Sequence, residues 1–364
     1  MASLSAEERT ALTDALTRLL ADHSAEAEVR RTMASEAGFD ADLWKRLADM
    51  GVVGLMVEET FGGAGAGPME MEAVMEAAGA SLLCSPLLAS GVVAAEFLRA
   101  LGDEDAKTRL LPRIADGSLI ATVALTGEAG TWTRDGIDVV AEADTLSGAA
   151  SYVLHGQNAG VLLVLARSGD GLAAFEIDPK AAGVSIEPLP TFDHTTRLAR
   201  IAFDRTPGKR LVGDAWPAAR TAMDLALVAL AGEQAGGAKR CLELTVDYAK
   251  NRFQFGRAIG SFQAIKHMAA DLLLESESAV SAARHAAARL AERAKDSDAA
   301  ISLAAFACAD AFVKTTADAV QMHGGIAFTW EHPAHLYLRR ARADAQLFGT
   351  SADHRERFLK ALGA

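Results

Sequence analysis

The feature that most constrains the fold is a change of residue pattern in the middle of the chain. Residues 118–207 consist of short β-rich runs broken by Gly, Asp and Pro. These runs predict roughly seven strands, at 119–125, 136–142, 151–155, 161–166, 172–177, 184–188 and 199–203. Strands this short and this closely spaced are typical of a small β-barrel or sandwich.

The segment before the strands has the pattern of helices only. Ser5 and Glu8 form a capping box that opens a helix ending at about His23. Apolar residues at helical spacing predict a second helix at 40–50, which Gly51 ends. Further helices are expected at 69–80, 85–101 and 103–115.

The segment after the strands returns to helix. Long Ala/Leu-rich helices are expected at 215–252, 261–294 and 297–321, and shorter ones at 334–347 and 351–362. Long helices with short connections pack as an antiparallel bundle. The chain is therefore predicted to be α+β and multidomain, with an N-terminal helical domain at 1–117, a middle β domain at 118–207 and a C-terminal four-helix-type bundle at 208–364.

Composition excludes several classes of partner. The formal net charge is −12, from 36 basic and 48 acidic residues, which argues against binding to nucleic acid or to an anionic membrane. Apolar runs such as 222–231 are too short to span a bilayer. Cys84, Cys241 and Cys308 have no metal-ligand spacing and are expected to be buried free thiols. No metal site is expected. With no signal-peptide pattern at the polar, acidic start, we expect a cytoplasmic protein.

The segment between the first two long C-terminal helices has the residues of an anion site. Gly256 is a plausible helix stop and Ser261 a plausible N-cap, so the segment is expected to be a helix–loop–helix corner. Arg252 and Arg257 lie beside the exposed amides of the next helix, and guanidinium groups with free amides suit a phosphate or pyrophosphate. The alternative is an ordinary capped corner with two solvated arginines.

Three motifs resemble one family. Arg252-Phe-Gln-Phe-Gly256, with Phe262-Gln263, is similar to the Arg-x-x-Phe-Gly and Gln signature of the acyl-CoA dehydrogenases. The stretch from Gln321-Met-His-Gly-Gly325 to Arg342 resembles the second signature of that family. Glu58-Glu59-Thr-Phe-Gly62-Gly63 resembles its Pro-Glu-Glu-Tyr-Gly-Gly segment. The resemblance covers essentially the whole chain.

The resemblance implies a FAD enzyme that removes two hydrogens across the α and β carbons of an acyl-CoA thioester. In the family, a glutamate takes the α proton, flavin N5 takes the β hydride, and an electron-transfer flavoprotein accepts the electrons. One subunit's β domain cradles the flavin ring, and the neighbouring subunit holds the adenosine diphosphate end. By position, that second role falls to Arg252, Gln254, Phe255, Gln263, Gln321, Gly324 and Gly325. His323 is expected to be structural rather than catalytic.

The flavin-ring half of the family pattern does not carry over. Where the family has Thr-Glu-Pro-Gly-Ala-Gly-Ser-Asp, this chain reads Thr126-Gly-Glu128-Ala-Gly130-Thr-Trp-Thr133. Where the family has Trp-Ile-Thr-Asn-Gly, it reads Tyr152-Val-Leu154-His-Gly156. Tyr152 can still stack on a ring, but Leu154 replaces the threonine that hydrogen-bonds the flavin near N5 and has no donor.

The catalytic base is missing from both positions that the family uses. Those positions are Phe348 and Ala226, and neither side chain can abstract a proton, so no catalytic residue is assigned. Asp224, Glu233 and Asp344 are the nearest carboxylates. Glu233 lies roughly 10 Å along the helix axis from Ala226, and Asp344 points inward only if its segment is helical. A solvated or capping role is expected for each.

The chain thus keeps motifs that serve a neighbour's cofactor and lacks those that serve its own. This asymmetry favours a subunit of a hetero-oligomer whose homologous partner supplies the flavin-ring pocket and the glutamate, as in family members that act on bulky acyl-CoAs such as steroid side chains. Two alternatives stay open. One is a self-sufficient homo-oligomeric dehydrogenase with an unrecognised base, and the other is a non-redox scaffold or acyl-CoA-binding protein on the same fold.

Overall fold

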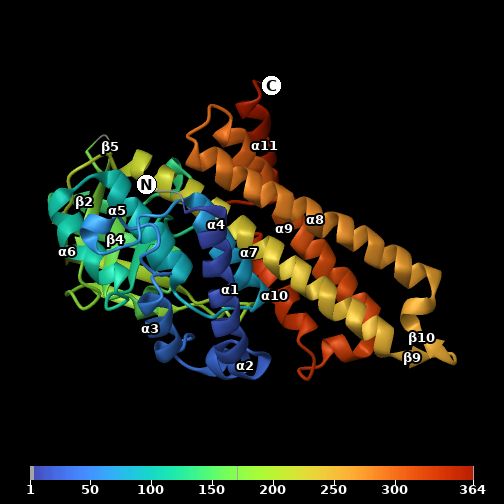
Figure 1. The fold of residues 1–364 in the computed structure, drawn as a ribbon. Coiled ribbons are helices and arrows are strands. Elements are labelled where there is room, and N and C mark those ends of the chain that lie inside the picture. The colour runs from blue at the N-terminus through green and yellow to red at the C-terminus, as the bar shows by residue number, and fades with distance from the viewer. Residues whose placement is uncertain (1–3, 170, 364) are drawn as a thin grey trace. The chain divides into compact units, whose positions relative to one another are not determined.

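The structure, a computed structural model, describes residues 4–169 and 171–363 (Figure 1). Helices come first, a curled β-sheet follows and long helices end the chain, so the predicted fold class is confirmed. Contacts divide the described chain into two compact units. The first comprises residues 32–67 and 84–226, and the second comprises 4–31, 68–83 and 227–363. Because these units interleave segments, the three domain boundaries remain a prediction.

The first unit is built around a single sheet. Its strands are β1 (Ala121–Ala124), β2 (Val140–Glu142), β3 (Thr145–Leu154), β4 (Val161–Ser168), β5 (Gly171–Ile177), β6 (Val184–Pro188), β7 (Leu198–Pro207) and β8 (Lys209–Arg210). They run in the order β6-β7-β3-β2-β4-β5-β8, and β1 pairs with β4 in parallel. The core of the sheet contains Leu146, Val164, Phe175 and Ile201, all buried. The predicted strands are present, and β8 lies beyond the predicted β segment.

Short helices complete the first unit. They are α3 (Ala41–Asp49), the 3-10 turn η1 (Glu59–Phe61), the π-helix η2 (Leu88–Ala94), α5 (Ala95–Leu101), α6 (Glu104–Ala115), and the 3-10 turns η3 (Arg134–Gly136) and η4 (Gly156–Asn158). Asp40 and Asp103 cap α3 and α6 through their side chains. The indole Nε1 of Trp44 donates to the carbonyl O of Gly117 at 2.9 Å. This hydrogen bond joins α3 to the segment that leads into the sheet.

The second unit is helical. Its elements are α1 (Ala6–His23), most of α2 (Glu26–Ala34), α4 (Pro68–Ala80), α8 (Gln263–Ala291), α9 (Ser297–His323), α10 (Ala334–Asp344), α11 (Ser351–Ala361) and the 3-10 turns η5 (Ile259–Ser261) and η6 (Gly324–Phe328). Helix α7 (Ala215–Asn251) starts in the first unit and ends in the second. The capping box of Ser5 and Glu8 is present, and Thr350 and Asp353 form a second one.

Glycines let α4 and α7 approach each other at backbone distance. A Cβ on Gly79 would lie 1.9 Å from the carbonyl O of Glu233, and one on Gly236 would lie 1.9 Å from that of Glu76. Gly237 leaves room for the ring of Phe312 on α9. The small residues of this part of α7 therefore serve close packing, because any side chain there would overlap the neighbouring helix.

Two further predictions from the sequence concern the state of the cysteines and the absence of a membrane-spanning segment. Cys84, Cys241 and Cys308 are buried and free, as predicted. One stretch of the described chain, Ser297–Phe328, is long and apolar enough to cross a membrane, and 67% of its most apolar window is buried inside the protein. A buried core helix has the same composition. The expectation that the chain has no membrane partner stays a prediction.

Candidate functional site

The segment between α7 and α8 folds as a β-hairpin. Strands β9 (Phe253–Gln254) and β10 (Arg257–Ala258) pair antiparallel, with Gln254 opposite Arg257. Phe255 and Gly256 form the two-residue loop, and both have positive φ, 53° and 77°. Positive φ at both central residues is the signature of a type I′ turn, the turn that matches the twist of two strands. Figure 1 shows the hairpin where α7 ends and α8 begins.

Two local predictions about this corner are wrong. Gly256 is not a helix stop, since α7 ends at Asn251 and Gly256 supplies the positive φ of the hairpin loop. Ser261 is not an N-cap, because it ends the 3-10 turn η5 and its hydroxyl donates to the carbonyl O of Ala258 at 2.7 Å. Helix α8 starts two residues later, at Gln263, without a side-chain cap. Because the hairpin and the 3-10 turn η5 occupy residues 253–261, α8 starts at Gln263 rather than at the predicted residue 261.

The two arginines of the hairpin have different surroundings. The guanidinium of Arg257 lies over the ring of Phe262, 4.0 Å from its centroid, and is therefore held by a cation–π contact. Arg252 is exposed, and within the described chain its side chain has no ion pair. Its backbone carbonyl accepts a hydrogen bond from the N–H of Ile259 at 2.8 Å, which closes the base of the hairpin. Arg252 is thus the cation available to an external anion.

The second motif begins where α9 ends. Gly324 has a φ of 67°, and the chain continues into η6. His323 is buried, and its Nδ1 donates to the carbonyl O of Ala319 at 2.7 Å. Its ring lies 4.4 Å from that of Tyr248 on α7, so the ends of α7 and α9 are neighbours. Burial lowers the pKa of His323. These contacts support the structural role expected for this histidine.

All seven predicted cofactor residues are exposed. They come from the hairpin, the start of α8 and the end of α9, namely Arg252, Gln254, Phe255, Gln263, Gln321, Gly324 and Gly325. Nothing lies within 4 Å of where a Cβ on Gly324 or Gly325 would be, so a ligand can approach this backbone closely. The contact between Tyr248 and His323 brings the two motifs to the same end of the second unit.

Exposed aromatic residues surround these motifs, and among them only Phe255 was assigned to the cofactor from the sequence. The exposed fractions are 63% for Phe253, 92% for Phe255, 79% for Phe328 and 51% for Trp330. The guanidinium of Arg339 lies 4.9 Å from the Trp330 ring centroid. Aromatic residues concentrated on short loops were the available sequence signal. Apolar rings that remain in water are typical of surfaces that a partner covers.

Apolar side chains fill the two family positions for a base. Phe348 is 5% exposed and has a φ of 61°, and Ala226 is 0% exposed. No group at either position can take a proton.

The expected solvated or capping role is wrong for two of the three nearby carboxylates. Glu233 is buried and ion-paired with Arg340, so its charge is compensated inside the protein. Asp344 is the last residue of α10 and is also buried, which agrees with the inward orientation expected for a helical segment. Asp224 is half-buried and lies 3.5 Å from Arg220, one turn earlier on α7. Tertiary packing, not solvent, surrounds Glu233 and Asp344.

The β-sheet positions that correspond to the flavin-ring contacts offer few polar groups. Leu154 is buried. The hydroxyl of Thr126 is also buried and donates to the carbonyl O of Ser151. Tyr152 lies at an irregularity in the β3–β7 register, with a φ of 55°, and its ring packs against Gly130, where a Cβ would lie 2.2 Å from the ring. The ring of Tyr152 thus lies on the loop that follows Thr126.

These observations test how well the chain fits a flavin dinucleotide. The exposed Arg252, the open backbone surface at Gly324 and Gly325 and the bare aromatic rings fit a phosphate-bearing, partly aromatic ligand at the end of the second unit. In the first unit, Leu154 provides no hydrogen-bond donor where a reduced flavin needs one. The residues therefore fit the adenosine diphosphate end of the cofactor and do not fit its ring.

Comparisons of the sequence with known proteins identify the family. Residues 6–118 match the family model "Acyl-CoA dehydrogenase, N-terminal domain", and residues 213–363 match "Acyl-CoA dehydrogenase, C-terminal domain". The chain is 37% identical to acyl-CoA dehydrogenase IpdE2 of Mycobacterium tuberculosis, over 94% of this chain and 93% of the relative.

Solved structures of acyl-CoA dehydrogenases have the same fold as this chain. The ChsE4–ChsE5 complex from Mycobacterium tuberculosis aligns with a TM-score of 0.90 and 27% identity, over 100% of this chain and 99% of the other. A variant of the steroid acyl-CoA dehydrogenase Tcur3481–Tcur3483 aligns with a TM-score of 0.89 and 29% identity, over 98% of each chain. The chain belongs to the acyl-CoA dehydrogenase family, FAD-dependent oxidoreductases that act on CH–CH bonds.

Proposed function

We propose that this chain is the non-catalytic subunit of a heteromeric acyl-CoA dehydrogenase. In this assembly a homologous partner supplies the flavin-ring pocket and the catalytic glutamate. This chain supplies contacts to the adenosine diphosphate end of the partner's FAD through Arg252, Gln254, Phe255, Gln263, Gln321, Gly324 and Gly325. The acyl-CoA is oxidised in the partner's site, and an electron-transfer flavoprotein-like protein accepts the electrons.

The observation that carries the proposal is the contrast between two sets of positions. The adenosine-side residues are all exposed and lie at one end of the second unit. The base positions hold buried Phe348 and Ala226, and buried Leu154 stands at the flavin-donor position. A chain that used its own flavin would need the second set, whereas a chain that serves a neighbour needs only the first.

The relatives support a paired assembly. The solved relatives with 27% and 29% identity are each named for two proteins, ChsE4–ChsE5 and Tcur3481–Tcur3483, and the second is a steroid acyl-CoA dehydrogenase. A bulky, steroid-like acyl group is therefore the substrate class that we propose for the complex. A cytoplasmic location is proposed with it, since the reaction needs a soluble CoA thioester.

The test is co-purification with flavin. The chain is expressed alone and together with the homologous dehydrogenase subunit encoded beside it, and flavin absorbance per chain is measured for each preparation. We expect flavin only in the co-expressed complex, with turnover of an acyl-CoA. Stoichiometric flavin and turnover in the lone chain would instead establish a self-sufficient enzyme, and absence of flavin from both preparations would favour a non-redox scaffold.

A variant separates cofactor binding from folding. Arg252→Ala in this chain should lower the flavin content of the complex by about tenfold, because a phosphate loses its charge-assisted partner. Arg18→Ala is the control, because Arg18 is also exposed and lies on α1, outside the hairpin. Equal flavin content in the two variant complexes would contradict the assignment of Arg252.

A further inference from the structure

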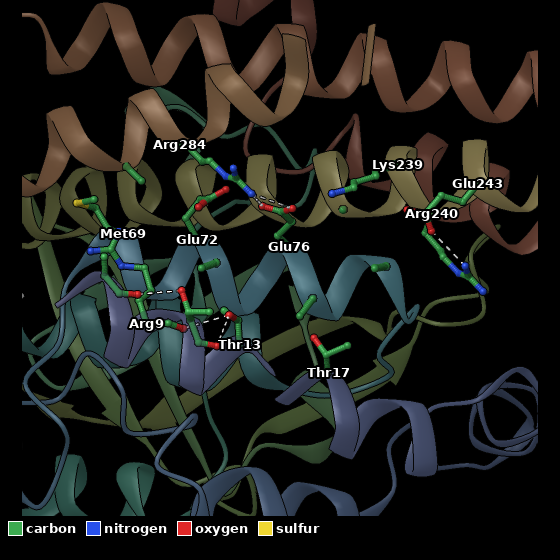
Figure 2. Close-up of a pocket in the computed structure, with 17 residues that line it drawn as sticks. Arg9, Thr13, Thr17, Met69, Glu72, Glu76, Lys239, Arg240, Glu243 and Arg284 are labelled. Atoms are coloured by element: carbon green, nitrogen blue, oxygen red, sulfur yellow. Dashed lines mark hydrogen bonds and ion pairs between the residues drawn. The ribbon is translucent and has the colours of Figure 1, made fainter. Parts of the chain in front are cut away.

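A cavity lies among four helices of the second unit. Its walls come from α1, α4, α7 and α8, and its volume is about 580 Å³ (Figure 2). Pockets of roughly 300–1,000 Å³ are the usual size for small-molecule sites. None of the seven residues assigned to FAD lines this cavity, which we call the α1–α4 pocket.

Small residues create the space. Ala73, Ala77 and Ala80 of α4 line the pocket, together with Gly236 of α7 and Ala287 of α8. The close approach of α4 and α7 at Gly236 holds these two walls together. Thr10, Thr13 and Thr17 of α1 form a further wall, and the hydroxyls of Thr10 and Thr13 donate to carbonyls of their own helix. The pocket therefore combines an apolar surface with hydroxyl oxygens that can still accept hydrogen bonds.

A buried carboxyl group lines the pocket without a full set of partners. Glu72 is 3% exposed, and its Oε1 makes no hydrogen bond within the described chain. Burial raises the pKa of Glu72 to about 8, and Glu76 raises it further, whereas Arg284 and Arg9 act in the opposite direction. At neutral pH, Glu72 is therefore mostly a neutral acid that can donate a hydrogen bond. An unsatisfied buried polar atom calls for a ligand, a water or a polar partner.

The arginines that line the pocket are ion-paired with carboxylates, and within the described chain Lys239 is not. Arg284 pairs with Glu76 at 2.9 Å, and Arg240 pairs with Glu243 at 3.2 Å. Arg9 Nε lies 3.4 Å from Glu70 Oε1 and makes no hydrogen bond. Lys239 has no ion pair in the part of the chain that the structure describes. Figure 2 shows Glu72, Glu76 and Arg284 grouped together, with Lys239 on the side of Glu76 away from Glu72.

We propose that the α1–α4 pocket binds a small amphipathic monocarboxylate. Its head accepts a hydrogen bond from Glu72 and is neutralised by Lys239, and its alkyl body lies against Ala73, Ala77 and Ala80. A monoanion supplies both the acceptor that Glu72 lacks and the charge that Lys239 lacks. A phosphate would bring a second negative charge beside Glu76, and an amine would repel Lys239. The inference does not rest on the proposed function.

The site predicts a dependence on pH. The titratable groups that face Glu72 are Arg9 on α1, Glu76 on α4, Arg284 on α8 and the buried thiol of Cys308 on α9, with Lys239 on α7 lining the same pocket. When Glu72 ionises, the donor is lost and a second carboxylate faces the ligand. Affinity for a carboxylate should therefore be nearly constant between about pH 6 and about pH 7, where the ligand is ionised and Glu72 is mostly neutral, and fall as the pH rises through 8.

Calorimetric titration of sodium octanoate into the full-length chain tests the site. We expect saturable one-to-one binding that weakens by about tenfold between about pH 6.5 and about pH 9. Octanamide, octylamine and inorganic phosphate should each bind at least about tenfold more weakly than octanoate at the lower pH. Octanoyl-CoA has no free carboxylate, so it should not compete with octanoate.

Three variants complete the test. Lys239→Met should weaken octanoate binding by about tenfold, whereas Lys266→Met, an exposed lysine of α8, should leave it unchanged. Glu72→Gln keeps a neutral hydrogen-bond donor, so octanoate should still bind. Its affinity should no longer decrease above pH 8. Each of three results would overturn the proposal: no saturable binding at about pH 6.5, equal loss in both lysine variants, or competition by octanoyl-CoA.

Discussion

Arg340 on α10 and Glu233 on α7 form a buried ion pair. Their side chains are 7% and 5% exposed, and Nη2 of Arg340 also donates to the carbonyl O of Leu83 at 3.1 Å. The arginine compensates the buried charge of the carboxylate, which gives Glu233 a structural role. Glu233, which lies on α7 seven residues beyond the empty base position of Ala226, therefore has a structural partner, which supports the proposal that another subunit supplies the base.

Removing the arginine should destabilise the second unit strongly. Arg340→Met leaves Glu233 buried without its partner, and such losses cost roughly 3–5 kcal/mol of unfolding free energy. Urea unfolding followed by circular dichroism measures the change. Lys45→Met breaks an exposed pair with Asp49 and should cost less than about 1 kcal/mol. A cost for Arg340→Met as small as that of the control would show that the buried pair is not structural.

A substitution at Phe255 in the hairpin loop tests whether its exposed ring contacts the partner subunit without disturbing the loop conformation. Phe255 has a φ of 53° and is 92% exposed, so its ring contributes little to the stability of the lone chain. Asn tolerates positive φ better than Phe, and Phe255→Asn should therefore leave the unfolding free energy within about 0.5 kcal/mol. In the complex, however, the same change should lower flavin content and weaken subunit association, as gel filtration and absorbance measure. An unchanged complex would remove Phe255 from the interface.

Gly236 should tolerate no side chain. Its Cβ would lie 1.9 Å from the carbonyl O of Glu76, so Gly236→Ala must push α4 away from α7, at a cost of roughly 2–4 kcal/mol. Gly325→Ala is the matched control, because nothing lies within 4 Å of its added Cβ. Thermal unfolding of the two variants checks the difference. If both melt at the wild-type temperature, the helices are not packed as tightly as described.

Glu72 should make stability fall as the pH rises. Its pKa is raised by burial from 4.5 to about 8, so the folded state favours the neutral acid. This contribution is fully present below about pH 4.5 and is lost as the pH rises through 8. Glu72→Gln does not titrate, and its advantage over wild type should reach on the order of 5 kcal/mol above pH 8. Urea midpoints from about pH 5 to about pH 9 measure it, and parallel curves would contradict the assignment.

Restoring a carboxylate at the family position should harm the fold. Phe348→Glu buries an acid where the ring is 5% exposed, which costs roughly 2–4 kcal/mol at neutral pH. The penalty should shrink as the pH falls toward about 4, because the introduced acid then becomes neutral. Phe348→Leu is the apolar control and should show no such pH dependence. We also expect no turnover by the lone Phe348→Glu chain, since Leu154 still lacks a donor to flavin.

Local sequence patterns predicted the elements well. The long helices appear within a few residues of the predicted limits, as α7 at Ala215–Asn251 and α9 at Ser297–His323 illustrate. Their apolar periodicity and composition act over many residues, so single misplaced residues matter little. The hairpin at Phe253–Ala258 escaped prediction because its strands are only two residues long, and Phe is an unusual choice for a position with positive φ.

The sequence by itself determined the helix–sheet–helix order, the motifs at Arg252 and Gln321, and the absence of a base at Phe348 and Ala226. These features depend on residue identity and spacing along the chain. Only the tertiary structure decided that Arg340 holds Glu233, that Gly236 contacts the backbone of Glu76, and that Glu72 and Lys239 line the same cavity. Each of these depends on which side chains meet across helices far apart in sequence, and helix periodicity identifies a buried face without naming its partner.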